Sequence, residues 1–330
     1  MKDVAVAAGV SVMTVSRAFK EDSSVKRETR DHIRQTAEAL GYVFDGTASN
    51  LRMKRSDFVA VIIPSVNSAN FADTVRGLSD VVEARGRQIL LGNSDYDVSR
   101  EEKLIDQLLR RRPEAIVLTG GRHTSRARKL LVSAGIPVIE TWDLPEEPIG
   151  HVVGFSNAAT MEAMVAHLVT SGRRRIAFIG GDASSDTRGA DRRRGFVRAM
   201  QAHGLAADHL VGIGTPPASM TKGAEAMKQV LRNLPDVDAV VGVSDLAAFG
   251  ALTECMRQGI LVPDQIAIAG FGAYEIASVS VPALTTIDVR PREIGHRTGR
   301  MVLSILDGDG AAFPQISKIE PMLTLAESAP

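Results

Sequence analysis

Hydroxyl, thioether and guanidinium groups gather between residues 11 and 17, at a spacing that suits contact with a DNA groove. Apolar residues at positions 4, 5 and 8 recur at helical spacing, a turn follows at Gly9, and Ser11 can cap a second helix from about Val12 to Lys20. One side of that helix would present Met13, Thr14, Ser16 and Arg17, while Val12, Val15 and Phe19 can anchor it. This is the layout of a recognition helix that enters a major groove by its N-terminal end, although an ordinary helical hairpin shares the same periodicity.

Polar and aromatic side chains also follow several apolar runs further along the chain, where buried strands would end. Ligands of open α/β folds bind at the carboxyl ends of the strands. The candidates at these ends are Ser65, Asn67, Asn70, Phe71, Trp142, Asp143, Ser156, Asn157, Ser244 and Asp245. Phe71 or Trp142 could stack on the apolar face of a sugar. Structural roles compete with these: Ser244 and Asp245 suit helix caps, and Trp142 suits core packing.

Patterns typical of catalysis, nucleotide binding or metal binding are missing. No phosphate-binding glycine loop with Lys-Ser/Thr and no Gly-x-Ser-x-Gly nucleophile elbow occurs, and Gly212-Ile-Gly214 is followed by Pro216 and Pro217, unlike a dinucleotide fingerprint. The seven histidines are scattered, and the single cysteine, Cys255, is distant in sequence from the nearest histidine pair. We therefore expect no cofactor, no metal ion and no catalytic residue.

The composition bounds the class of protein. With 330 residues and 44% apolar content, the chain can form two or three domains with real cores. Its net charge is zero, yet residues 1–55 hold ten Lys/Arg against seven Asp/Glu, so a modestly basic amino-terminal part precedes a slightly acidic body. One cysteine allows no internal disulfide, no apolar run approaches eighteen residues, and from the residues after Met1 we expect no leader peptide. We expect a reducing, cytoplasmic location and no membrane partner.

The remaining chain divides into a short helical part and a long α/β part. A third helix is expected from about Arg27 to Leu40, with Ile33, Ala37 and Leu40 as its apolar stripe and Gly41 at its end. The segment 47–55 is too polar to hold a helix alone, so it should order only when docked. After Ser56, continuous apolar runs alternate with amphipathic helical segments, at 59–63, 89–91, 115–118, 138–139, 152–155, 176–179, 211–213, 239–243, 266–271 and 285–289.

Continuous apolar runs indicate strands that are buried on both faces, so the sheets should be mostly parallel. The pattern runs twice, which predicts two doubly wound halves with a ligand crevice between them. We expect a helical headpiece at 1–45 and a linker at 46–56. The first half would comprise 57–156 and 287–316, and the second 157–286 and 317–330.

The whole chain resembles the lactose-repressor (LacI/GalR) family of bacterial transcription regulators. The most specific portion is the amino-terminal Lys2-Asp-Val-Ala5, Ala8-Gly-Val-Ser11, Thr14-Val-Ser-Arg17, Thr29-Arg30, Leu40-Gly-Tyr42, Leu51-Arg52 and Arg55-Ser56. The body adds Ala134-Gly-Ile-Pro-Val138, Arg193-Arg-Gly-Phe196, Ser244-Asp245, Gly270-Phe271 and Pro282-Ala-Leu-Thr-Thr286. Leu118-Thr119, His123-Thr124, Val153-Gly-Phe-Ser-Asn157 and Ile268-Ala-Gly-Phe271 are similar to the gluconate-operon repressor branch. The resemblance implies a periplasmic-binding-protein-like body.

For the headpiece, the resemblance implies a division of labour on DNA. Val12, Met13 and Arg17 would read bases, Thr14 and Ser16 would contact phosphates, and Leu51 would wedge into the minor groove from a hinge helix. Two positions depart from the family. Lys26 stands where a capping Ser is common, and a phosphate contact is its alternative role. Phe44-Asp45 replaces the common Pro-Asn before the hinge.

For the body, the resemblance implies that Arg192 grips the effector, with Arg188 nearby. A guanidinium fork matches a carboxylate or a pair of sugar hydroxyls. The family often carries Asp just after a Gly-Phe pair like Gly270-Phe271, but this chain has Gly272 there. The missing hydroxyl acceptor argues against a neutral hexose and favours a sugar acid such as gluconate.

Together these features predict a repressor of a carbohydrate-catabolism operon. Its partners would be double-stranded operator DNA, a small sugar or sugar-acid effector, and a second copy of the chain in a homodimer. Whether dimers pair into tetramers stays open from the sequence. The alternative is a sugar-binding protein or a sugar-acid enzyme without a DNA function.

Overall fold

The computed structural model describes residues 1–19, 24–44, 56–181, 186–309 and 314–330. They fall into two compact units, Met1–Ser56 and Asp57–Pro330. Lys20, at the expected end of the second helix, lies outside the described residues. So do the linker residues 46–55, which include the predicted wedge Leu51.

The smaller unit consists of α1 (Lys2–Ala7), α2 (Val12–Ala18) and α3 (Arg27–Ala39). Its core is made of small and branched side chains, Val4, Ala5, Ala8, Val15, Ala18, Ile33 and Ala37. Gly41, in the left-handed conformation at φ +60°, follows the end of α3 as predicted. The expected apolar stripe of α3 was wrong at one position. Leu40 is the C-cap residue and is 51% exposed, because the helix ends before the stripe reaches it.

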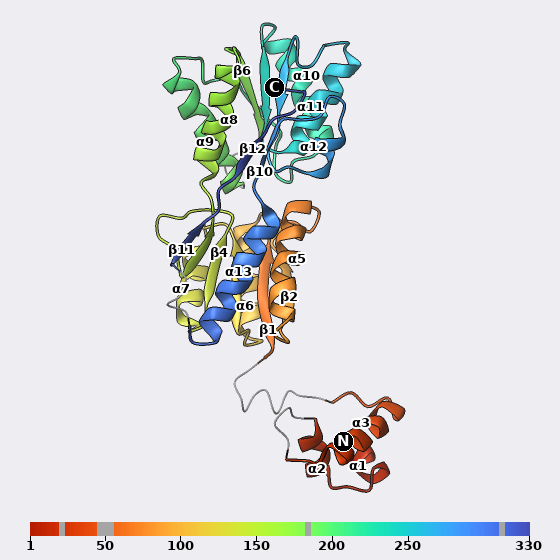
Figure 1. Ribbon diagram of the computed structural model, residues 1–330. Coiled ribbons are helices and arrows are strands. Elements are labelled where there is room, and N and C mark those ends of the chain that lie inside the picture. Colours follow the sequence, from red (N-terminus) through yellow and green to blue (C-terminus); the bar gives the residue numbers. More distant parts are fainter. Residues whose placement is uncertain (20–23, 45–55, 182–185, 310–313) are drawn as a thin grey trace. The chain divides into compact units, whose positions relative to one another are not determined.

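The larger unit has two lobes (Figure 1), and the first is built on a six-stranded sheet of order β11-β5-β4-β3-β1-β2 in which every pair is parallel. Its strands are β1 (Phe58–Ile63), β2 (Gln88–Asn93), β3 (Ala115–Thr119), β4 (Val138–Thr141), β5 (His151–Gly154) and β11 (Ile316–Lys318). Its helices are α5 (Ala69–Glu83), α6 (Val98–Leu109), α7 (Ser125–Ser133) and α13 (Pro291–Leu306).

The second lobe is built on a four-stranded parallel sheet of order β7-β6-β8-β9. Its strands are β6 (Ile176–Gly180), β7 (Leu210–Gly212), β8 (Ala239–Gly242) and β9 (Ala267–Ala269). The helices are α8 (Asn157–Thr170), α9 (Thr187–Ala202), α10 (Met220–Asn233), α11 (Asp245–Arg257) and α12 (Glu275–Val279). Figure 1 shows α8 and α9 on one side of this sheet and α10, α11 and α12 on the other.

Strand β1 shows why the apolar runs are continuous. Val59, Val61 and Ile63 belong to the large core cluster that includes residues of α5 and α13. Ala60 and Ile62 belong to a second cluster with residues of α6 and α7. Helices therefore cover both faces of the sheet at β1, and its residues from Val59 to Ile63 are buried. This confirms the prediction of mostly parallel, doubly covered sheets.

A third, two-stranded sheet departs from the parallel pattern. Strand β10 (Thr286–Asp288) pairs antiparallel with β12 (Met322–Thr324), near the junction of the two lobes (Figure 1). The sequence missed β11 and β12, because both are three-residue strands with exposed positions and carry no continuous apolar run. The expected boundary at 286/287 falls within β10, and that at 316/317 falls within β11.

The backbones of helices α5 and α13 approach each other closely at two glycines. A Cβ atom on Gly295 would lie 2.1 Å from the carbonyl oxygen of Thr74, and one on Gly77 would lie 2.4 Å from that of Arg292.

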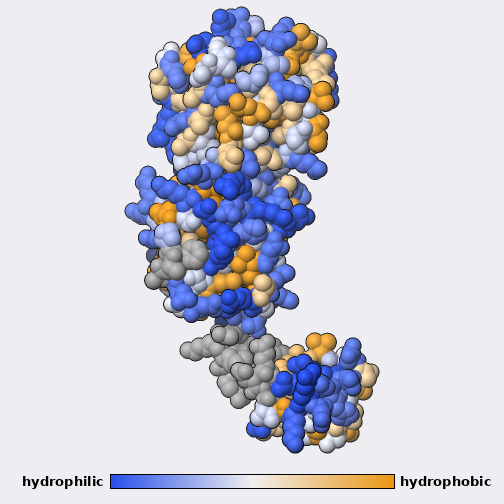
Figure 2. All heavy atoms as spheres, viewed as in Figure 1, coloured by the Kyte–Doolittle hydropathy of each residue, from blue (hydrophilic) through white to orange (hydrophobic). Residues whose placement is uncertain are grey.

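On the face shown in Figure 2 the surface is largely hydrophilic, with apolar residues in separate patches. None of the described helices has both the length and the apolar character of a bilayer-spanning segment.

Candidate functional site

Helix α2 begins at a side-chain cap and is anchored by two buried residues. The Ser11 Oγ atom accepts a hydrogen bond from the backbone N–H of Thr14 at 3.1 Å, which confirms the predicted cap. Val15 and Ala18 are fully buried against α1 and α3. The expectation that Val12 anchors the helix was wrong, because its side chain is 42% exposed.

The predicted base-reading residues lie on the exposed side of α2. Val12 and Arg17 are exposed. Met13 is 66% exposed, although methionine side chains are more often buried. Thr14 and Ser16 are partly exposed, and the Thr14 hydroxyl lies 2.8 Å from that of Ser11. The exposed side of α2 therefore presents apolar and hydroxyl groups near its start and the Arg17 guanidinium in its last turn.

Lys26 stands at the N-cap position of α3 and makes no side-chain cap. The side chain is exposed, and its ammonium group has no partner among the described residues. This confirms that the usual cap is missing. It also leaves a positive charge next to the start of a helix.

Phe44, which with Asp45 replaces the Pro-Asn pair common before the hinge, packs against the end of α2. Its ring stacks on that of Phe19 at a centroid distance of 4.9 Å and an interplanar angle of 9°. Tyr42 meets Phe19 edge-on at 6.4 Å. The chain after α3 is thus fastened to the end of α2.

In the larger unit, a cavity of about 300 Å³ lies between the two lobes. Nearly all of its lining follows the carboxyl ends of strands in both sheets, as expected for this fold class. The lining residues are Ser65, Asn67, Ser68, Asn70, Phe71, Tyr96, Trp142, Asp186, Arg188, Arg192, Pro217, Ala218, Ser219, Val243, Ser244, Leu246, Phe271 and Tyr274.

Most of the sequence-predicted effector residues come together in this lining. Ser65, Asn70, Phe71, Trp142, Arg188, Arg192 and Ser244 belong to it, as does Asn67. Trp142 combines both of its expected roles, since it lines the cavity while its indole Nε1 donates to Thr74 Oγ1 at 3.1 Å.

Ser156 and Asp245 are not in the lining. The Ser156 hydroxyl caps α8 by accepting from the N–H of Ala159 at 3.2 Å. Asp245 is fully buried, and its carboxylate accepts from the N–H of Tyr274 at 2.7 Å and from the Thr286 hydroxyl at 2.5 Å. Burial raises the pKa of Asp245 to about 6 despite these bonds. Both residues stabilise the walls of the cavity.

Arg192 is fixed on three sides at the cavity wall. Its Nε atom donates to Asn157 Oδ1 at 3.0 Å and its Nη1 atom to the carbonyl of Val243 at 2.8 Å. The guanidinium carbon lies 3.8 Å from the centroid of the Phe271 ring. Burial lowers the pKa of Arg192 from its ordinary value. Among the described residues its Nη2 group has no partner, so that donor is available to a ligand.

Arg188 lies one helical turn before Arg192 and contacts the opposite lobe. Its Nη1 atom donates to the carbonyl oxygen of Thr119 at 3.1 Å, and its guanidinium carbon lies 5.6 Å from the Phe71 ring centroid. A Cβ atom on Gly120 would approach this guanidinium to 2.7 Å, so Gly120 allows the contact.

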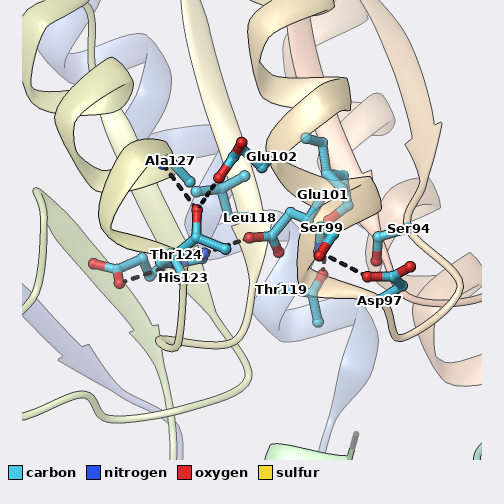
Figure 3. Close-up of polar contacts among 12 residues, drawn as sticks. Ser94, Asp97, Ser99, Glu101, Glu102, Leu118, Thr119, His123, Thr124 and Ala127 are labelled. Carbon is cyan, nitrogen blue, oxygen red and sulfur yellow. Dashed lines mark hydrogen bonds and ion pairs between the residues drawn. The ribbon is translucent and has the colours of Figure 1, made fainter.

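The loop that follows Thr119 is held by a cluster of buried charged side chains around His123 (Figure 3). The Nδ1 atom of His123 lies 2.6 Å from Glu101 of α6, and Nε2 lies 3.4 Å from Glu140 of β4. Burial alone would lower the pKa of His123, but the hydrogen bond to Glu101 and the nearby carboxylate of Glu140 outweigh it and raise the pKa to about 9. The imidazolium thus links α6, β4 and the loop that carries His123.

Four helices begin at the cavity, because α5, α9, α10 and α11 each follow a lining residue. Their N-cap residues are Ser68, Asp186, Ser219 and Ser244. Helix N-termini carry partial positive charge, which adds to that of the two arginines. Among the described lining residues Asp186 is the only carboxylate, and it already accepts from the N–H of Gly189 at 3.0 Å. The cavity therefore favours an anion.

Sequence reasoning missed Tyr96, Asp186 and the cavity role of Tyr274. Burial raises the pKa of both phenols, that of Tyr96 to about 12, so both remain hydrogen-bond donors. Tyr96 and Asp186 also follow strands, β2 and β6, so a full survey of strand ends would have found them. No metal-binding group of three His, Cys, Asp or Glu residues occurs in the parts of the chain that the structure describes.

Comparison with known proteins gives consistent relatives. A family model for bacterial regulatory proteins of the lacI family matches residues 1–45, and one for a periplasmic binding protein-like domain matches residues 165–328. The transcriptional regulator GntR of Pseudomonas aeruginosa is 36% identical over 308 residues, which cover 93% of this chain and 89% of that protein.

Solved structures agree with these relatives. A LacI family transcriptional regulator from Silicibacter pomeroyi matches with a TM-score of 0.94 at 31% identity, covering 99% of this chain and 98% of that one. The transcription regulator GntR from Chromobacterium violaceum matches with a TM-score of 0.78 at 33% identity, covering 82% and 99%.

Proposed function

Because the chain belongs to the lacI family of bacterial regulatory proteins, we propose that it represses a carbohydrate-catabolism operon under the control of a sugar acid, gluconate or a close relative. It is a DNA-binding regulator with a sugar-binding domain, and the identity of the sugar is the proposal. The observation that carries the proposal is the pair Arg188 and Arg192 in a cavity where four helices begin.

A carboxylate suits this cavity better than a neutral sugar does. The lining holds two guanidinium groups and one carboxylate, that of Asp186, so its charged groups sum to a positive charge. A guanidinium binds a carboxylate through charge-assisted hydrogen bonds, which are about twice as strong as neutral ones. Hydroxyl groups of the ligand would meet Ser65, Asn70 and Ser244. The relatives named GntR support gluconate among the sugar acids.

We assign the DNA contacts to the exposed side of α2 and its neighbours. Val12, Met13 and Arg17 would meet base edges, and Thr14, Ser16 and Lys26 would meet phosphates. Exposure of these side chains supports the assignment. Leu51 would act as the minor-groove wedge.

A homodimer is part of the same proposal. Two headpieces would read the two halves of a near-palindromic operator, and the effector would change operator affinity by binding two arrangements of the lobes unequally. A dimer is typical of the family. The two lobes are also proposed as the moving parts, with the whole of β11 in the first lobe.

Calorimetric titration of the full-length protein with gluconate, other aldonates and glucose tests the ligand. We expect an aldonate to bind at least ten times more tightly than glucose, and Arg192→Ala to abolish that binding. Arg198→Ala, which removes an exposed guanidinium of the same helix outside the cavity, is the matched control. Equal binding of glucose and gluconate, or unchanged aldonate binding by Arg192→Ala, would overturn the proposal.

A further inference from the structure

Tyr96 occupies an unusual backbone conformation beside the cavity. Its φ angle is +58°, and that of the preceding Asp95 is +55°, a left-handed region that residues other than glycine enter rarely and at an energetic cost. Consecutive residues of this kind persist only where the surrounding structure enforces them, and they cluster at ligand sites.

The turn that holds Tyr96 is fixed at both ends. The N–H of Ser94 donates to the carbonyl oxygen of Ile63 at 2.9 Å, and the N–H of Asp97 donates to that of Ser94 at 3.0 Å. Asp97 then caps α6 by accepting from the N–H of Ser99 at 2.7 Å (Figure 3). The strained turn therefore directs the Tyr96 ring into the cavity lining.

The Tyr96 hydroxyl has no hydrogen-bond partner among the described residues. The residue is partly buried, and its hydroxyl is not one of the fully buried polar atoms that lack a partner, so this group remains accessible. The other phenol of the lining shows the contrast, since the Tyr274 hydroxyl lies 2.9 Å from that of Ser68. Burial keeps the Tyr96 phenol protonated, with a pKa of about 12. It is thus an accessible donor at the cavity wall that makes no hydrogen bond to the described residues.

The Tyr96 ring also lies where the main cavity meets a smaller one. A second cavity of about 30 Å³ is lined by Tyr96 and Arg188, which both cavities share, and by Glu101 and Arg122 among others. Such a volume holds one or two water molecules and no sugar carbon chain. The ring therefore forms part of the wall that limits the length of a ligand in the main cavity.

We propose that Tyr96 is a specificity-determining residue of the effector site: its hydroxyl donates a hydrogen bond to one hydroxyl of the ligand, and its ring limits ligand length. The inference rests on the proposed function for the ligand class, a polyhydroxylated acid. The position of the residue at the cavity is independent of that class.

The test is a calorimetric titration of full-length wild type and Tyr96→Phe with gluconate and with gluconates that each lack one hydroxyl. Tyr96→Phe keeps the ring and removes the donor. We expect it to weaken gluconate binding about 5- to 30-fold, as the loss of one hydrogen bond would. One deoxy analogue should bind both proteins equally, because the partner of the phenol is then already missing. Tyr42→Phe, which makes the same change in the smaller unit, should bind every ligand as wild type does.

The outcomes separate this inference from the proposed function. If wild type and Tyr96→Phe bind gluconate equally, the role of Tyr96 is overturned and the proposed function stands. If Tyr96→Phe weakens all analogues by one common factor, the specific hydroxyl contact is overturned. If wild type ignores aldonates but binds a neutral sugar that Tyr96→Phe loses, the ligand class is wrong and the role of Tyr96 stands. If no sugar or aldonate binds wild type, both are overturned.

Discussion

The side-chain amide of Asn157 joins Arg192 to Trp142: its Oδ1 atom accepts from Arg192 Nε at 3.0 Å, and its Nδ2 atom donates to the Trp142 carbonyl oxygen at 2.9 Å. Asn157 is 1% exposed, so neither bond can be replaced easily by water. Trp142 follows β4 of the first lobe, and Arg192 belongs to α9 of the second. The buried amide of Asn157 thus links the Arg192 guanidinium of the second lobe to the Trp142 backbone of the first lobe.

We predict that Asn157→Ala weakens aldonate binding by at least tenfold. The substitution removes the partner of Arg192 Nε and leaves the Trp142 carbonyl unsatisfied, which should also lower the free energy of unfolding by about 2–4 kcal/mol. Titration calorimetry and urea unfolding measure the two effects. Asn233→Ala, at the exposed end of α10, should change neither by more than about 0.5 kcal/mol. Wild-type affinity in Asn157→Ala would contradict the orienting role.

Gly195 permits the close packing of α9 on α8, and thereby the position of both arginines. A Cβ atom there would lie 2.2 Å from the carbonyl oxygen of Ala158, which belongs to the backbone and cannot rotate away. Gly195→Ala should therefore destabilise the larger unit by about 1–3 kcal/mol and weaken ligand binding. Gly212→Ala places its methyl group in open space at an ordinary φ and should leave both unchanged. If the two variants melt at the same temperature, the packing argument fails.

The buried pair of His123 and Glu101 predicts a pH dependence of stability. The pKa of His123 is about 9 in the folded protein, against an ordinary value of 6.5 for histidine. A raised folded-state pKa means that protonation favours the folded state. The contribution, on the order of 3 kcal/mol, is complete below about pH 6.5 and is lost as the pH rises through 9.

Urea unfolding between pH 6 and 10 measures this effect on the transition of the larger unit. Wild type should lose stability above pH 7 relative to His123→Gln, which cannot carry the charge. The variant should be less stable than wild type at pH 6, and the difference should shrink towards pH 10. Parallel pH profiles for the two proteins would show that His123 is not charged between Glu101 and Glu140.

Lys26 gives a prediction in which stability and DNA affinity move in opposite directions. Lys26→Ser supplies the missing cap of α3, so amide hydrogen exchange in its first turn should slow by an amount equal to about 0.5–1 kcal/mol. The same change removes a proposed phosphate contact. Operator affinity should fall, and the slope of log affinity against log salt should decrease by about 1. An unchanged salt slope would remove Lys26 from the DNA-contacting set.

Local signals made the headpiece predictable. Ser11 as a cap and Gly41 as a helix terminator depend on a few neighbouring residues, and both predictions are confirmed. Leu40 was placed on the buried stripe because periodicity does not show where a helix ends. Val12, expected as an anchor of α2, is 42% exposed, and the buried residues of that helix are Val15 and Ala18.

The cavity was predictable only in part, because its lining depends on tertiary contacts. Polar residues after strands predicted Ser65, Asn70 and Ser244 in the lining. The same rule selected Ser156 and Asp245, which instead cap a helix and bind buried donors. Nothing in the sequence separates these cases. Tyr96 enters the cavity through a left-handed turn that the sequence does not predict. A positive φ is usually indicated by glycine, but the residues of this turn are Asp95 and Tyr96.

The central claim is that a sugar acid held by the arginines of the cavity changes the affinity of the headpieces for DNA. Fluorescence anisotropy of operator DNA, titrated with wild type and Arg192→Ala with and without gluconate, tests it most directly. We predict that gluconate changes the operator affinity of wild type by about 5- to 150-fold, the usual range of such coupling, and leaves that of Arg192→Ala unchanged. An operator affinity of wild type that no aldonate alters, or an equal response in Arg192→Ala, would contradict the account.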